Sequence, residues 1–432
     1  MTHRVVVDLG FGDAGKGTVV DRLCARGPEP VHAVVRFNGG AQAAHNVVAP
    51  DGRHHTFAQF GSGTLTPGVR THLSRFMLVD PLALAAEAGH LISLGVADAF
   101  DRLTVDADAL LTTPYHRAVN RAREEARGPA RHGSCGMGIG ETVAYSLERP
   151  GLAPRVGDCR DRLRLRRSLS MLRDWALDAF SHAEVPNVDD CLEAFTAFGE
   201  RVQVVGGEYL TRLLRNGNVV FEGAQGVLLD EWHGFHPYTT WSTTTFANAE
   251  TLLAEANASA VRVGVVRAYM TRHGPGPFVT EDPALTAELP DRHNTFGRWQ
   301  GTFRVGHLDL VALRYALTVT GGVDELAVTH LDVARDRPDL LLCRAYRMEG
   351  TTVAELPAGS TGDLARQEAL TRRLLAARPL YEPLGDPVAA LESGLGVKVA
   401  LRSYGPTADD KVTGDASPPR PHAGRGGRAG PR

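Results

Sequence analysis

A short glycine-rich stretch near the N-terminus constrains the fold more than any other feature of this chain. Residues 10–17 read Gly-Phe-Gly-Asp-Ala-Gly-Lys-Gly, after an apolar run at 5–7 that is typical of a buried strand. The residues that follow favour a helix. A strand, a glycine turn and a helix together present backbone N–H groups and a helix N-terminus, which bind phosphate well. Taken alone, the stretch also fits a purely structural turn.

The spacing of this stretch nearly matches a phosphate-binding loop. Gly10, four residues, Gly15 and Lys16 fit the pattern, but Gly17 stands where a Ser or Thr hydroxyl would bind Mg²⁺. Asp13 inside the loop should repel phosphate unless a metal or a proton transfer requires it. Lysine occurs only at positions 16, 398 and 411, whereas Lys and Arg together number 47. A lysine kept in the loop indicates that a compact point charge is needed there.

Composition excludes several classes of protein. The chain has 432 residues, 43% of them hydrophobic, which suffices for one large domain or two. The net charge is −3, and no apolar run reaches the ~18 residues of a membrane span, so neither a nucleic-acid nor a membrane partner is expected. The five cysteines form no CxxC pair and no metal-binding spacing. A strand begins almost at the N-terminus, so we expect no signal peptide and a cytoplasmic protein with free thiols.

Predicted strands alternate with helical patterns along the chain, so we expect an α/β fold with a large, mostly parallel central sheet. Residues 160–214 are mostly helical and form an excursion from the sheet. Residues 271–278 are expected to form a rigid loop, and residues 294–306 a mobile loop. We expect a single domain over 1–408, followed by a disordered tail rich in Pro, Gly and Arg over 409–432.

Glycine turns recur where the predicted strands end, and ligands of open parallel sheets bind at the carboxyl ends of the strands. This favours one large nucleotide-binding cleft. Asp332 follows one such strand, and a carboxylate there can accept hydrogen bonds from guanine N1–H and its 2-amino group, which adenine lacks. An Asp in this position more often caps a turn or helix. His45 lies in a loop of small residues, which favours ligand contact, although a lone histidine is usually structural.

The assembled motifs resemble the adenylosuccinate synthetase family, whose members join a purine nucleotide to aspartate at the expense of GTP. The resemblance covers about residues 4–407 and implies one catalytic domain over 1–408, a phosphate-loop-like GTP site and a carbon–nitrogen ligase. The motifs that carry it lie, in chain order, at 12–17, 36–45, 136–140, 221–226, 228–230, 271–278, 329–332 and 403–406.

The resemblance also implies a role for each matching residue. Asp13 removes the purine N1 proton and meets Mg²⁺ together with the backbone of Ala44. His45 stabilises the transferring phosphoryl group, and Gln225 completes the catalytic set. GTP is assigned to Gly12, Gly15, Lys16, Gly17, His330, Asp332, Ser403 and Gly405; the IMP-like nucleotide to Asn38, Gln42, Ser134, Cys135, Arg149, Gln225, Thr240 and Arg304; and L-aspartate to Thr271, Arg272, Arg298 and Arg304. Because the arginine matching Arg149 reaches IMP in the neighbouring subunit, a homodimer is implied.

Three loops depart from the family pattern. Gln42 replaces an Asn that contacts IMP, and residues 132–136 read His-Gly-Ser-Cys-Gly instead of a motif with Thr-Thr-Gly. The arginine-rich loop for the amino acid reads Arg-Trp-Gln-Gly-Thr-Phe-Arg-Val at 298–305, with only Arg304 in register. The main hypothesis remains ligation of L-aspartate to IMP. The alternatives are a paralogue in specialised metabolism, acting on a modified purine-like nucleotide or with another amine, and a non-catalytic GTP-binding relative.

Overall fold

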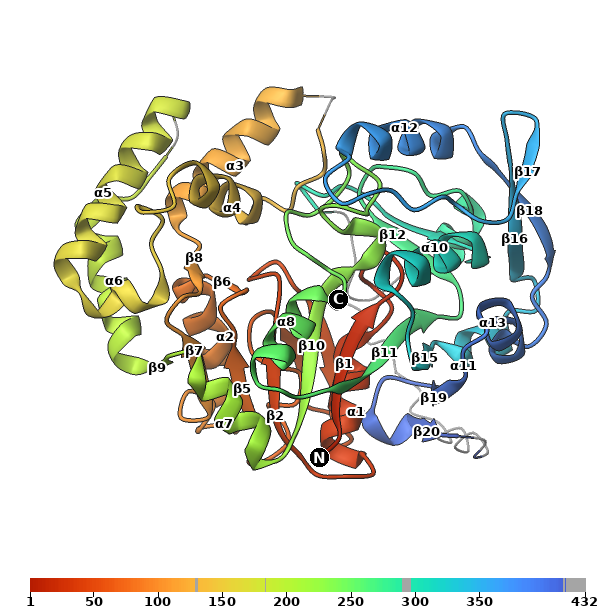
Figure 1. Cartoon of the computed structure of the whole chain (residues 1–432), viewed down its shortest axis with the longest axis horizontal. Coiled ribbons are helices and arrows are strands. Elements are labelled where there is room, and N and C mark those ends of the chain that lie inside the picture. Colours follow the sequence, from red (N-terminus) through yellow and green to blue (C-terminus); the bar gives the residue numbers. More distant parts are fainter. Residues whose placement is uncertain (129–130, 183, 290–296, 415, 417–432) are drawn as a thin grey trace, which may run out of the picture.

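A ten-stranded sheet organises the described part of the chain (Figure 1). The computed structural model describes residues 1–128, 131–182, 184–289, 297–414 and 416. All neighbouring strands of this sheet are parallel except β19 and β20, so the expected mostly parallel α/β sheet is confirmed. In spatial order the strands are β20 (Lys411–Thr413), β19 (Val399–Ser403), β15 (Glu325–Thr329), β11 (Ala260–Arg267), β1 (His3–Asp8), β10 (Asn218–Gly226), β2 (Val31–Arg36), β5 (Arg70–Leu73), β7 (Leu103–Asp106) and β9 (Gln203–Val205).

Shorter strands form small sheets beside the main one. They are β3 (His45–Val48) with β4 (His54–Phe57), β6 (Leu78–Val79) with β8 (Leu110–Leu111), β12 (Met270–His273) with β13 (Phe303–Gly306), and β14 (Leu308–Asp309), β16 (Leu341–Met348), β17 (Thr351–Val353) and β18 (Arg378–Pro383). Of the last group, β16, β17 and β18 lie at one end of the molecule, at the right of Figure 1.

The helices cover the sheet and extend beyond it at the opposite end, where α3 to α6 lie (Figure 1). Their bounds are α1 Lys16–Arg26, α2 Pro81–Ser93, α3 Pro114–Arg127, α4 Ile139–Glu148, α5 Arg162–Ala179, α6 Val188–Arg201, α7 Glu208–Asn216, α8 Ala247–Glu255, α9 Pro283–Glu288, α10 Leu310–Thr320, α11 Leu331–Asp336, α12 Leu364–Leu375 and α13 Pro387–Leu395. Among these described helices, none has the length and apolar character needed to cross a membrane.

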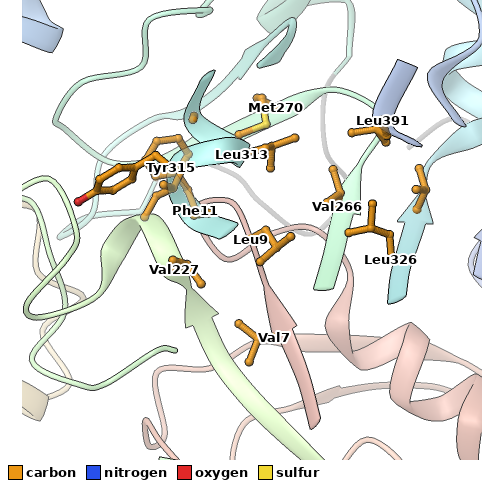
Figure 2. Packing of buried hydrophobic residues seen from close by; sticks show 14 of the residues in the cluster. Val7, Leu9, Phe11, Val227, Val266, Met270, Leu313, Tyr315, Leu326 and Leu391 are labelled. Carbon is orange, nitrogen blue, oxygen red and sulfur yellow. The ribbon is translucent and has the colours of Figure 1, made fainter. Parts of the chain in front are cut away.

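Strand β1 is apolar because both of its faces are buried. Val5 and Val7 belong to a large core cluster that includes residues of α10, whereas Val6 packs with Val19 of α1 on the other face. Figure 2 shows Val7 in this large cluster, together with Leu313 of α10. A central strand of a parallel sheet needs apolar side chains at successive positions. The run at 5–7 therefore fixes β1 as an inner strand.

Aspartates mark the starts of several helices. The side chain of Asp80 accepts hydrogen bonds from Leu82 N and Ala83 N at the start of α2, and Pro81 follows it as the first helical residue. Such caps satisfy backbone N–H groups that have no partner within the helix. Asp161, Asp309 and Asp386 cap α5, α10 and α13 in the same way.

Two predicted loops instead contribute strands. The segment expected as a rigid loop at 271–278 begins inside β12, and the segment expected as a mobile loop ends in β13. β12 pairs antiparallel with β13, with Arg272 opposite Arg304. Residues 294–296 lie outside the described residues. The loop prediction was wrong for residues 271–273 and 303–306, because pairing between segments about 30 residues apart leaves no local pattern in the sequence. Residues 160–214 are mostly helical as predicted, but they also supply the edge strand β9.

The predicted tail begins too early. The chain continues past residue 408 into β20, which pairs with β19 and leaves Lys411 only 2% exposed. The composition of 409–432 as a whole is rich in Pro and Gly, so it gave no indication of this short strand. The strand is stabilised by its pairing with β19. Residues 415 and 417–432 lie outside the described residues, so the tail prediction for them is neither confirmed nor contradicted.

Candidate functional site

The turn after β1 is shaped by Asp8, a residue that sequence analysis did not single out. Its buried carboxylate accepts hydrogen bonds from Gly10 N at 2.8 Å and Ala14 N at 2.7 Å, and from Lys16 Nζ at 3.3 Å. Lys16 Nζ also donates to Gly12 O at 2.7 Å. The signal available in the sequence was a charged residue directly after the apolar run at 5–7. The glycine loop is therefore preformed, with its lysine inside it.

Gly17 lies where His45 approaches the first turn of α1. A Cβ at position 17 would lie 2.6 Å from the Cβ of His45 and 3.1 Å from Oγ of Ser62. A contact below 3.0 Å would force the chain apart, so a Ser or Thr cannot occupy this position. The departure from the usual phosphate-loop pattern thus has a steric reason: glycine lets the start of β3 pack against the loop. Gly15, just before α1, has a φ of 89°, which glycine adopts readily.

His45 is hydrogen-bonded to Glu222, in the middle of β10. Its Nδ1 lies 2.6 Å from Oε1 of Glu222, and Oε2 of Glu222 accepts Ser62 N at 2.9 Å. Burial raises the pKa of Glu222, but the charge of Arg36 and the bond from His45 outweigh burial and bring that pKa to about 2. Burial lowers the pKa of His45 to about 4, against the effect of Glu222. The histidine is therefore neutral, with its proton on Nδ1 and its Nε2 available as an acceptor.

Asp13 borders a narrow pocket with Gly10, Arg267 and Thr271 among its lining residues. Burial, followed by the nearby carboxylate of Asp8, raises the pKa of Asp13 to about 6, although positive groups such as Lys16 oppose the shift. A carboxylate with a raised pKa is a better base for a proton near neutral pH. Glu222 and Asp8, the partners of His45 and of the loop, are the site residues that sequence analysis missed.

A column of three side chains connects the Asp13 loop to the end of β15. Arg267 donates to Asp13 O at 3.4 Å and hydrogen-bonds the hydroxyl of Tyr269, with its Cζ 4.4 Å from the tyrosine ring centroid. The ring of Tyr269 meets the ring of His330 edge-on at 5.8 Å. His330 has a φ of 58° and precedes α11, so it is the residue at which β15 turns sharply into the helix.

Two glutamine amides predicted to bind the IMP-like nucleotide face the same glycine. A Cβ at Gly39 would lie 3.1 Å from Oε1 of Gln225 and 3.5 Å from Nε2 of Gln42. Within the described structure, Oε1 of Gln225 and both amide atoms of Gln42 are buried without a hydrogen-bond partner. Buried amides almost always have partners, so these groups point to a ligand at this place.

Asn38, also predicted to contact the nucleotide, hydrogen-bonds the backbone of Ala224. Its Nδ2 donates to Ala224 O at 3.0 Å, and its Oδ1 accepts Ala224 N at 2.7 Å. The side chain is fully buried and joins the segment after β2 to the last residues of β10, which include Gln225. Asn38 therefore holds the end of β10 in place, and its contact with the nucleotide stays a prediction.

The residues predicted for the base of GTP lie at the ends of β15 and β19, which are neighbours in the sheet. Asp332 is in the first turn of α11, directly after β15. Ser403, the last residue of β19, donates to Gly405 O at 3.1 Å. Because neighbouring parallel strands end at the same sheet edge, these residues share one side of the site.

The two loops that differ most from the family lie against each other. A Cβ at Gly136 would lie 3.0 Å from Cδ1 of Trp299. Arg121 donates to Gly136 O at 3.1 Å, and its Cζ lies 5.9 Å from the Trp299 ring centroid. On the same loop, Ser134 bonds Asn120 of α3, and burial raises the pKa of Cys135. Trp299 is thus packed into the loop predicted to contact the nucleotide.

The three arginines predicted to bind L-aspartate are engaged with the protein. Arg272 is 1% exposed and donates to the carbonyls of Pro275 and Pro277 at 3.0 and 2.9 Å. Arg304 donates to the carbonyls of Gly274 and Gly276 and pairs with Glu281. Arg298 pairs with Glu125 at 3.4 Å. Arg272 and Arg304 therefore hold the turn at 273–278, whereas Arg298 has an exposed partner.

The remaining predicted residues lie on four different segments of the chain. Arg149 is the residue after α4, with its guanidinium 5.8 Å from the ring of Tyr145. Thr240 donates its backbone N–H to Leu229 O at 2.8 Å. Thr271 is 5% exposed in β12. Ala44 immediately precedes His45 and is exposed.

The described residues include no group of three or more His, Cys, Asp or Glu side chains that could hold a metal ion. A Mg²⁺ ion at the glycine loop would have Asp13 as its protein carboxylate. This fits Mg²⁺, which commonly binds through one or two carboxylates together with substrate phosphates. The residues present are therefore compatible with a shared protein–phosphate magnesium site.

The sequence comparisons agree on one family. A family model for adenylosuccinate synthetase matches residues 5–412. The adenylosuccinate synthetase of Salinibacter ruber is 34% identical over 451 residues, covering 96% of this chain and 98% of the relative. That of Myxococcus xanthus is 35% identical over 397 residues, covering 89% of this chain and 87% of the relative.

Two solved structures are similar to this chain. The fully ligated adenylosuccinate synthetase from Plasmodium falciparum has a TM-score of 0.81 at 23% identity, covering 96% of this chain and 100% of that chain. The cyanophage S-2L succinoaminodeoxyadenylate synthetase, bound to dGMP and to dATP as an energy donor, has a TM-score of 0.62 at 19% identity, covering 95% of each chain. At these identities, the likeness shows a common fold.

Proposed function

Because this chain belongs to the adenylosuccinate synthetase family, whose members are ligases that form a carbon–nitrogen bond, we propose that it ligates L-aspartate to IMP at the expense of GTP. The products are adenylosuccinate, GDP and phosphate. The observation that carries the proposal is that Asp13 and the His45–Glu222 pair both lie at the glycine loop.

The first step activates the purine. Asp13 accepts the N1 proton of IMP, and the negative charge passes to O6, which attacks the γ-phosphorus of GTP while the bond to the β–γ bridging oxygen breaks. The amine of aspartate then adds to C6, the C6–O6 bond breaks, and the departing phosphate takes up the proton that the amine loses. A raised pKa supports Asp13 in this role, because a base must hold the proton that it removes.

His45 acts on the transferring phosphoryl group. Glu222 holds its Nδ1 proton, so a proton taken from water at Nε2 makes a cation whose charge faces the phosphoryl oxygens. Phosphoryl transfer depends mainly on positioning and charge neutralisation. Lys16 and the backbone N–H groups of the loop supply the remaining positive charge and hydrogen-bond donors for the phosphates. Mg²⁺, held by the Asp13 carboxylate and the Ala44 carbonyl, would add positive charge at the phosphates when bound.

The IMP-like nucleotide lies beside Gln42 and Gln225, whose unpartnered buried amides support this placement. Ser134, Cys135 and Thr240 border the nucleotide, and the partner subunit of a homodimer receives Arg149. Asp332 reads guanine by accepting from N1–H and the 2-amino group, with His330, Ser403 and Gly405 around the base. We place the enzyme in the cytoplasm, in purine biosynthesis.

One observation favours a second candidate for the amine donor. Arg272 and Arg304 donate to backbone carbonyls, and Trp299 stands in the loop that in the family carries arginines. A donor with less negative charge and more apolar surface suits this loop better than a dicarboxylate. Retention of Asp13 and His45 speaks against a non-catalytic GTP-binding relative.

The test is a product screen. The purified full chain is incubated with GTP, Mg²⁺ and pairs of purine nucleotides and amines, and the products are identified by mass spectrometry. Adenylosuccinate from IMP and L-aspartate supports the proposal. If another amine is ligated readily while saturating aspartate gives no product, the second candidate for the amine donor replaces L-aspartate. Absence of GTP-dependent phosphate release with every pair contradicts both.

A further inference from the structure

The C-terminal strand returns to the base side of the site. Ser403 of β19 pairs with Lys411 of β20, so the chain leaves the sheet, turns through residues 404–410 and re-enters opposite its starting point. Gly405, which is predicted to line the base, lies in this turn. The first residues of the segment expected to be a disordered tail therefore complete this turn.

The ammonium of Lys411 lies inside this turn. Its Nζ donates to Gly405 O at 3.2 Å, Pro406 O at 3.4 Å and Thr407 O at 2.7 Å, and the residue is 2% exposed. An ammonium has three donors, and here each meets a carbonyl of the same turn. The flat fork of an arginine cannot converge on three successive carbonyls in this way. The site therefore explains why position 411 holds one of the chain's rare lysines.

Further contacts fix the same turn. The Asp410 carboxylate accepts Thr407 N at 2.8 Å, and a Cβ at Gly405 would lie 2.8 Å from Oδ2 of Asp410. Thr18 of α1 donates its hydroxyl to Pro406 O at 2.9 Å. The turn is thus held from the C-terminal strand and also tied to the helix that follows the phosphate loop.

Charged groups from three elements surround Lys411. They are Asp21 and Arg22 of α1, Asp410 beside it and Asp332 of α11. Burial lowers the pKa of Lys411 to about 8, against the attraction of Asp21 and Asp410. The ammonium is therefore charged at neutral pH and loses its proton as the pH rises past about 8.

We propose that Lys411 is a positioning residue for guanine recognition: by binding three carbonyls of the turn at 405–407, it fixes Ser403 and Gly405 beside the base. The C-terminal strand thereby sets the preference for a guanine nucleotide. This inference rests on the proposed function only in taking GTP as the nucleotide.

The test compares Lys411→Met with Lys398→Met in the full chain. Lys398 is an exposed lysine that touches none of the proposed machinery, so it is a matched control. Binding of GDP, ADP and inorganic tripolyphosphate is measured by titration calorimetry. Because Lys411→Met removes the charge-assisted hydrogen bonds to the turn at 405–407, we expect it to bind GDP about 10- to 100-fold more weakly. ADP and tripolyphosphate should change less than about threefold, and KM for GTP should rise while kcat at saturating GTP stays constant.

Equal weakening of all three ligands would mean that Lys411 only supports the phosphate loop, and unchanged GDP binding would remove its role; either result overturns the proposal. If Lys411→Met does not fold, Thr18→Val removes a second tether of the turn, and a GDP-specific loss of about 2- to 10-fold is expected. In the unmodified chain, GDP binding should weaken above about pH 8.

Selective GDP binding without product from IMP and L-aspartate would refute the proposed function and leave this inference standing. Equal affinity of the unmodified chain for GDP and ADP would overturn the inference alone.

Discussion

Nδ1 of His45 lies 2.6 Å from Oε1 of Glu222, although the two residues are 177 positions apart in the chain. The carboxylate is charged and the imidazole neutral, so the pair determines which ring nitrogen carries the proton. A group that fixes the tautomer of a histidine also fixes the direction in which it can receive a proton.

We therefore expect Glu222→Gln to lower kcat by about 10²- to 10⁴-fold, with little change in KM for GTP, because the tautomer is no longer enforced. Steady-state kinetics measure the effect. Glu87→Gln is the control, since Glu87 is another buried carboxylate that accepts backbone N–H groups, at Ala58 and Gln59. Equal losses of kcat in both variants would reduce Glu222 to a structural role.

Asp13→Asn removes the proposed base and should lower kcat at least ~10²-fold, with GDP affinity nearly retained. His45→Ala should lower kcat similarly, because His45 packs against the glycine loop at Gly17. Single-turnover phosphate release from GTP measures the chemical step. Near-normal turnover in both variants would show that the active site lies elsewhere.

Asp332→Asn should weaken GTP and improve xanthosine triphosphate, whose 2-oxo group accepts a hydrogen bond where the 2-amino group of guanine donates one. Leaving a polar group unpaired costs about 1–3 kcal/mol, so the ratio of the two kcat/KM values should change at least about tenfold. Competition between the two nucleotides measures this ratio. Equal use of ATP and GTP by the unmodified chain would contradict base reading by Asp332.

L-aspartate should be a substrate with a KM above that expected of an arginine-rich loop. Arg304→Ala should raise this KM by about 10- to 100-fold, through loss of a charge-assisted contact or of the turn that Arg304 holds. Arg298→Ala tests whether Arg298 leaves Glu125 to bind the donor, and Glu125→Gln is its control. An unchanged KM in Arg298→Ala would exclude Arg298 from the donor site.

Asp309 gives a prediction about stability and pH. Burial raises its pKa to about 6 from 3.8, although it accepts hydrogen bonds from Tyr346 and from the start of α10. A raised folded-state pKa means that its contribution to stability is fully present below about pH 4 and is lost as the pH rises through about 6. Asn carries no charge at any pH, so Asp309→Asn should remove the decrease in stability between about pH 4 and pH 7. The free energy of unfolding at pH 7 should rise by up to about 3 kcal/mol. Denaturant unfolding at pH 4, 6 and 7 measures it; an unchanged pH slope would contradict the prediction.

The sequence by itself determined the class of fold and the centre of the site. The run at 5–7 and the glycine loop after it predicted an inner parallel strand and a phosphate-binding turn, because burial on both faces and positive backbone angles leave local marks. The order of the motifs identified the family. Asp13, His45 and Asp332 were predicted for the same reason: each stands at the end of a strand or in a turn beside one.

Only the tertiary structure decided which groups these residues work with. Glu222 faces His45, Trp299 packs against Gly136, and Lys411 closes the turn at 405–407, across 177 residues in the first case. Nothing in the sequence indicated that the side chains of Asn38 and Arg272, both predicted to contact ligands, bind backbone carbonyls. Contacts between distant segments depend on strand pairing and packing, and neither leaves a local pattern that a single sequence can reveal.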